Sequence, residues 1–115
     1  MFLSKDFTFD SAHFLTKYHG KCENLHGHTY KLRVTVEGPV GEEGMVMDFK
    51  ELKAVVKEKV LDRYDHQNLN DFFENPSAEL VAMKIWEDLA PELPVKLYEV
   101  ILWETAESFV TYRGN

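Results

Sequence analysis

Residues 26–37, HGHTYKLRVTVE, alternate strictly between two kinds of side chain. One set holds two histidines, Tyr30 and three aliphatic residues, whereas the other set is polar or charged apart from Gly27. Successive side chains of a β-strand point to opposite faces of a sheet, so a period of two predicts a strand. We expect both histidines on the apolar face of that strand.

Strands are expected in four segments, at residues 2–14, 26–37, 96–105 and 108–113. A helix is expected from Asp48, a capping residue that is followed three positions later by Glu51. A second helix is expected from Ser77 to the PELP segment at 91–94. The order ββααββ predicts an α+β fold, a four-stranded antiparallel sheet with two helices on one face. Its two unprotected edges favour oligomerisation through strand pairing.

Composition narrows the class of protein. The chain has 115 residues, 44% hydrophobic and 29% charged, which predicts one globular domain over residues 1–115. A formal charge of −7 without a cluster of basic residues disfavours nucleic acid and membrane surfaces as partners. Lys5 and Asp6 interrupt the apolar N-terminus, so we expect no secretory signal. A single cysteine, Cys22, suits a reducing compartment, and we expect a soluble cytoplasmic protein.

Three histidines are expected to meet at one point. His26 and His28 leave the same face of their strand. His13 lies near the end of the preceding strand and comes close to them if the two strands pair antiparallel around residues 15–25. Three neutral imidazoles with an open fourth position are typical of a catalytic zinc site. The alternative is three partly exposed histidines, and His19 is expected to be an ordinary loop residue.

Four further side chains are candidates for chemistry. Cys22 could complete a closed metal site, or it could act as a nearby thiolate base or nucleophile. Asp65 beside His66 matches a carboxylate that orients an imidazole for proton transfer, although this dipeptide is also common in turns. Glu104 follows a largely apolar strand and could bind a planar ligand edge with two N–H donors, or could simply lie at the surface.

Taken together, these segments resemble the family of 6-pyruvoyltetrahydropterin synthase and 6-carboxytetrahydropterin synthase enzymes, which have the tunnelling fold. The resemblance runs over nearly the whole chain through FDSAH (9–13), CENLHGH (22–28), GMVMDF (44–49), DHQNLN (65–70), NPSAE (75–79) and LWET (102–105). The short spacing between Cys22 and HGH is similar to that of the bacterial 6-carboxytetrahydropterin synthases of queuosine (7-deazaguanine) biosynthesis. Leu80 departs from the family, which commonly has Asn there.

The resemblance implies a role for each candidate residue. The Zn²⁺ ligands would be His13, His26 and His28. The catalytic residues would be Cys22, Asp65 and His66. Glu104 would hold the amino-pyrimidine edge of the pterin, helped by Thr105, Ser77 and Glu79.

The resemblance also implies an activity and an assembly. We expect a lyase that converts 7,8-dihydroneopterin triphosphate to 6-carboxytetrahydropterin, acetaldehyde and triphosphate, in a hexamer of two trimers with sites at subunit boundaries. The same residues suit a 6-pyruvoyltetrahydropterin synthase, and a zinc-binding module without turnover is a further alternative. Candidates for contacting the triphosphate are Lys17, Lys21 and Arg33.

Overall fold

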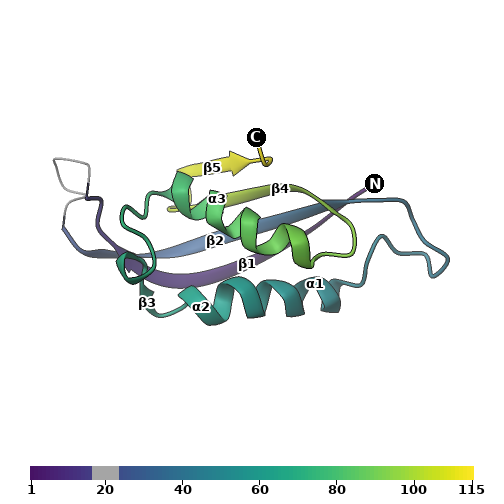
Figure 1. Cartoon of the computed structure of the whole chain (residues 1–115), viewed down its shortest axis with the longest axis horizontal. Helices are drawn as coiled ribbons and strands as arrows, with labels where there is room; N and C mark the ends of the chain where they lie inside the picture. The colour runs from purple at the N-terminus through teal and green to yellow at the C-terminus, as the bar shows by residue number, and fades with distance from the viewer. Residues whose placement is uncertain (17–23) are drawn as a thin grey trace.

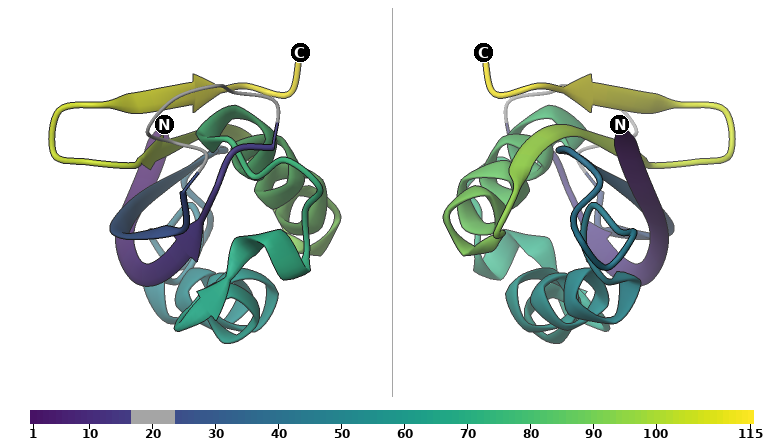
Figure 2. Two further views of the ribbon diagram at one scale, coloured as in Figure 1. Left: turned by 90° about the vertical axis from the view of Figure 1, so that its left-hand side faces the viewer. Right: turned by 90° about the vertical axis from the view of Figure 1, so that its right-hand side faces the viewer.

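The computed structural model describes residues 1–16 and 24–115 as one sheet covered on one face by helices (Figure 1). The strands are β1 (Phe2–His13), β2 (His26–Glu37), β3 (Gln67–Asn68), β4 (Lys96–Trp103) and β5 (Phe109–Tyr112). They lie in the order β3-β1-β2-β4-β5. In the end-on views of Figure 2 the sheet bends around the helices, which lie side by side within its curve.

The helical elements are α1 (Phe49–Val56), η2 (Lys57–Leu61), α2 (Asp62–Tyr64), η3 (Leu69–Asp71), α3 (Ala78–Leu89) and η4 (Ala90–Glu92). The first three run on as one segment in which η2 is a π-helical turn. Four buried residues, Leu52, Val56, Val60 and Tyr64, recur every four positions along it. That spacing drifts off the face of a regular α-helix, and the wider π turn returns Val60 and Tyr64 to the sheet.

The predicted fold class and the order ββααββ are confirmed, but the sheet has one strand more than predicted. The additional strand, β3, pairs in parallel with the edge of β1, with Ser11 opposite Gln67 and Ala12 opposite Asn68. The other pairings are antiparallel, as expected. A strand of two residues has too few positions to show a period, and its partner is far away in sequence. Its presence could not be predicted from local pattern.

The alternation of β2 sorts its side chains as predicted. Tyr30, Leu32, Val34 and Val36 face the helices and are fully buried. On the opposite face Arg33 donates two hydrogen bonds to the Asp6 carboxylate of β1, at 2.7 and 3.0 Å. This guanidinium, a candidate for binding triphosphate, is therefore already paired. Within the described residues, no helix combines the length and apolar character that crossing a membrane requires.

Replacing Asp48 tests whether the predicted helix start contributes to stability. The Asp48 carboxylate accepts a hydrogen bond from the backbone N–H of Lys50 at 2.8 Å and caps α1. Asp48→Ala should lower the free energy of unfolding by about 1 kcal/mol, measured by urea denaturation. Glu43→Ala, which removes an exposed carboxylate from the preceding turn, is the control and should have little effect. Equal losses in the two variants would contradict a capping role.

Candidate functional site

The register between β1 and β2 brings the three predicted metal ligands together. His13 lies directly opposite His26, and Ser11 lies opposite His28. The ring centroids are 4.7 Å apart for His13 and His26, 4.7 Å for His26 and His28, and 5.1 Å for His13 and His28. His13 is 1% exposed, whereas His26 and His28 lie nearer the surface. The imidazoles therefore form a cluster with a buried side and an open side.

Backbone carbonyls orient two of the rings. His13 Nδ1 lies 2.8 Å from the carbonyl oxygen of Pro76, and His26 Nδ1 lies 2.7 Å from that of Asn24. A carbonyl can only accept, so each Nδ1 carries a proton, and in the neutral ring each Nε2 keeps a free lone pair. The Tyr30 hydroxyl lies 3.2 Å from the same nitrogen of His13. These contacts select the tautomer that a metal-binding histidine needs.

Glu104 joins this cluster, a position that the sequence analysis did not predict. Its Oε1 lies 3.0 Å from His28 Nε2 and 3.5 Å from His13 Nε2. The β2–β4 register pairs Lys31 with Trp103, the last residue of β4, so Glu104, which follows it, lies on the face of Tyr30 and His28. The contact with His13 lowers the pKa of Glu104 against the opposing effect of burial, so the carboxylate is ionised at neutral pH.

The donor set fits a metal ion. One ligand atom from each of His13, His26, His28 and Glu104 lies within 4.8 Å of all the others. Within the described part of the chain, Nε2 of His13 and of His28 are buried and have no hydrogen-bond partner. Burial is the largest influence on His28 and lowers its pKa, which favours the neutral ring that binds a metal. Three nitrogen donors and one anionic oxygen could therefore bind a divalent cation.

Asp65 and His66 form a second cluster, with Asp10. The Asp65 carboxylate accepts the backbone N–H of Asp10 at 2.9 Å, and its other oxygen lies 3.0 Å from His66 Nδ1. His66 has φ = 58°, in the left-handed region that few non-glycine residues adopt, and donates its own N–H to the Asp10 carbonyl at 2.6 Å. The Asp10 N–H is the main cause of the lowered pKa of Asp65. An ionised Asp65 thus leaves His66 Nε2 free to exchange protons.

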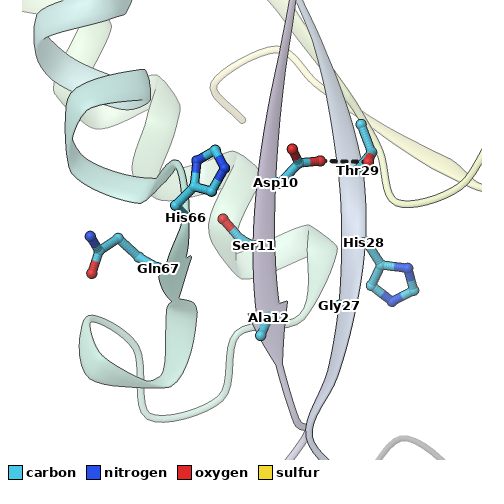
Figure 3. A pocket seen from close by; sticks show the side chains of 8 residues that line it. All are labelled: Asp10, Ser11, Ala12, Gly27, His28, Thr29, His66 and Gln67. Carbon is cyan, nitrogen blue, oxygen red and sulfur yellow. Dashed lines mark hydrogen bonds between the residues drawn. The ribbon is translucent and has the colours of Figure 1, made fainter.

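The two clusters lie on opposite sides of the β1–β2 pair, although His28 and His66 both contribute to the lining of one pocket. Figure 3 shows His66 beside β1 and His28 beyond β2, with both strands between them. A pocket of about 490 Å³ lies beside His66, and Ala12 and Gly27, which pair in the sheet, contribute to its lining. The small side chains at these two positions leave the sheet surface open next to an imidazole that is 77% exposed.

Two of the predicted substrate-binding residues, Ser77 and Thr105, directly follow residues that contact the histidine cluster, Pro76 and Glu104. Ser77 caps α3 by accepting the backbone N–H of Leu80 at 3.2 Å, and it directly follows Pro76, which contacts His13. Glu79 is exposed in the first turn of α3. Thr105 accepts the N–H of Ser108 at 3.1 Å in the turn after Glu104. Cys22, like His19, Lys17 and Lys21, lies outside the described residues.

Comparisons with known proteins agree on one family. A sequence model described as 6-pyruvoyl tetrahydropterin synthase matches residues 2–115. A 6-pyruvoyl tetrahydrobiopterin synthase of Dictyostelium discoideum is 47% identical over 86% of this chain and 78% of that protein. A 6-carboxy-5,6,7,8-tetrahydropterin synthase of Haemophilus influenzae is 38% identical over 96% of this chain and 97% of that protein. The solved 6-pyruvoyl tetrahydropterin synthase of Caenorhabditis elegans has a TM-score of 0.91 at 32% identity, covering 100% of this chain and 96% of that one.

Asp65→Asn should make the free energy of unfolding less dependent on pH in the acid range. The folded protein lowers the pKa of Asp65 below its usual 3.8, so the unfolded chain binds this proton more readily. The contribution of Asp65 is therefore present at neutral pH and is lost as the pH falls below about 4. Urea denaturation across this pH range measures it, with Asp71→Asn, at an exposed carboxylate nearby, as the control. The same acid dependence in Asp65→Asn and wild type would contradict this interpretation.

Proposed function

Because the chain belongs to the 6-pyruvoyl tetrahydropterin synthase family, we propose that it is a zinc-dependent lyase acting on 7,8-dihydroneopterin triphosphate. Its products would be 6-carboxy-5,6,7,8-tetrahydropterin, acetaldehyde and triphosphate, in queuosine biosynthesis. The observation that carries the proposal is the convergence of three imidazoles beside an ionised carboxylate, with buried ring nitrogens that have no hydrogen-bond partner in the described part of the chain. The single domain would act in the cytoplasm.

Two features favour 6-carboxytetrahydropterin as the product. Only three residues separate Cys22 from the first histidine of HGH, the short spacing of the bacterial 6-carboxytetrahydropterin synthases. The Haemophilus relative, which bears that name, aligns with this chain over almost its whole length. The Dictyostelium relative favours the alternative, 6-pyruvoyltetrahydropterin, because it is more identical in sequence over the part that aligns.

His13, His26 and His28 would hold the zinc ion. When bound, zinc would act as a Lewis acid that polarises the side-chain hydroxyls of the substrate and acidifies the adjoining C–H bonds. Glu104 lies at the edge of this cluster, where its carboxylate could accept two N–H groups from the amino-pyrimidine edge of a pterin. Ser77, Glu79 and Thr105 lie on the neighbouring segments and would assist in binding the ring.

Proton transfer would be shared by Cys22 and His66, acting from opposite sides of the substrate side chain. Asp65 holds the proton on Nδ1 of His66, so Nε2 is the atom that takes up or releases a proton. His66 has a left-handed backbone, and its ring lies beside β1 with 77% of the side chain exposed. The ring is thus presented to a substrate that approaches from outside the chain.

The separation of the two clusters supports a site built from more than one subunit. The histidine cluster and the Asp65–His66 pair share no residue, and Figure 3 shows His66 and His28 on opposite sides of the β1–β2 pair. In a hexamer of two trimers, one subunit would supply the zinc ion and a neighbour would supply the proton-transfer pair. The edge strand β5, of four residues, and the outer edge of β1 before its pairing with β3 at Ser11 are available for strand pairing between subunits.

Product analysis tests the proposed reaction. Zinc-loaded protein incubated with 7,8-dihydroneopterin triphosphate should release acetaldehyde together with a pterin that carries a 6-carboxyl group, both detected by mass spectrometry. Metal-stripped protein is the control and should form neither product. Retention of the three-carbon side chain would instead identify the 6-pyruvoyltetrahydropterin reaction.

Cys22→Ala separates catalysis from metal binding. If the thiol moves protons and does not bind the metal, the variant should retain its zinc but lose activity by roughly 10²-fold or more. Zinc content by atomic absorption and turnover are measured on the same sample. A variant that loses its zinc would favour a closed structural site, which corresponds to the alternative of a zinc-binding module without turnover.

A further inference from the structure

The segment that follows β1 is held by an asparagine side chain instead of a neighbouring strand. Backbone pairing between β1 and β3 ends at Ala12 and Asn68. Two residues beyond Ala12, Asn70 Oδ1 accepts the N–H of Phe14 at 2.9 Å, and its Nδ2 donates to the Phe14 carbonyl at 3.0 Å. One primary amide thus satisfies both backbone polar groups of one residue, as an adjacent strand does.

Asn70 is also held in place by contacts other than those with Phe14. Its backbone N–H donates to the Asn68 side chain at 3.0 Å, which caps the short helix η3. Leu69, between these two asparagines, is fully buried in the core. The amide of Asn70 is half-buried, so little water competes for its hydrogen bonds. The side chain of Asn70 therefore contacts Phe14 from a segment that is fixed by the cap of η3 and by buried Leu69.

The contact with Phe14 lies next to the most buried imidazole of the metal cluster. His13 forms the last pair of the β1–β2 ladder, and its ring contacts the Pro76 carbonyl. Thr16 N–H donates to the Asn75 side chain at 3.1 Å. Residues 70–76 therefore hold the chain immediately after the point where its pairing with β2 ends.

We propose that Asn70 is a positioning residue for the metal cluster, and that its amide fixes the backbone at Phe14 so that His13 Nε2 points at the shared metal position. The proposal rests on the metal-binding role of the histidines. His28 lies inside the β1–β2 ladder, whereas His13 and His26 form its last pair, and the Asn70 contact lies directly after His13. Without the amide, the backbone after His13 gains freedom and the ring loses its fixed direction.

Metal affinity measures the effect directly. Asn70→Ala should weaken Zn²⁺ binding by about 10- to 100-fold, the usual loss on removing a group that orients a metal ligand. The full chain is stripped of metal and titrated with Zn²⁺ in competition with a chromophoric chelator. Asp48→Ala, a cap variant of α1 far along the chain, is the control for general destabilisation and should keep wild-type affinity.

Two further measurements keep the test decisive. Asn70→Asp retains an acceptor for the Phe14 N–H but sets a carboxylate oxygen against the Phe14 carbonyl, so it should also weaken zinc binding, and it replaces Asn70→Ala if that variant does not fold. In metal-free protein, hydrogen exchange at the Phe14 amide should be faster in Asn70→Ala, which removes its acceptor, and unchanged in Asp48→Ala.

The outcomes distinguish this inference from the proposed function. Wild-type affinity in both Asn70 variants, or an equal loss in Asp48→Ala, overturns the positioning role and leaves the zinc site intact. A wild-type chain that binds no zinc overturns the proposed function, and the positioning role falls with it. Weaker zinc binding in the Asn70 variants, with faster exchange at Phe14 in Asn70→Ala and neither change in Asp48→Ala, supports the inference.

Discussion

The register of β1 against β2 is the interaction on which the rest of the site depends. Its pairs run from Phe2 and Glu37 to His13 and His26 without a break. A shift of this register by one residue would move every side chain of one strand, including its imidazoles, to the opposite face of the sheet. The apolar face prevents this, since Phe9 and Tyr30 lie directly opposite and stack at 5.2 Å. Burial of the apolar face therefore fixes the register, and the register brings the metal ligands together.

Much of this arrangement could be predicted because it depends on short-range pattern. The alternation of residues 26–37 gave the bounds of β2 and the shared face of His26 and His28. The caps Asp48 and Ser77 marked the starts of α1 and α3 correctly, because their side chains bond to backbone only two or three residues away. Helix caps of this kind can be predicted from the sequence alone, because they involve only residues that are close together in the chain.

The parts that could not be predicted depend on how distant segments are placed. Glu104 enters the histidine cluster through the β2–β4 register, which contains an irregularity between Thr35 and Val36 that local pattern does not reveal. The β4 strand carries apolar residues on both faces, so its alternation did not say which way Glu104 points. The placement of His66 relative to the imidazoles likewise depends on tertiary structure, because the resemblance implied sites at subunit boundaries but not which subunit supplies Asp65 and His66 to each site.

The histidine cluster breaks the rule that buried polar atoms find partners, and it does so at two ring nitrogens. Within the described residues, Nε2 of His13 and of His28 lack hydrogen bonds, and each such atom costs about 1–3 kcal/mol. Carbonyls fix His13 in the tautomer that leaves this nitrogen unprotonated, so the cost is built into the fold. A ligand that satisfied both atoms would recover that free energy as affinity and stabilise the folded chain. Ring nitrogens that are held in place and left without hydrogen bonds are what a preorganised cation site requires.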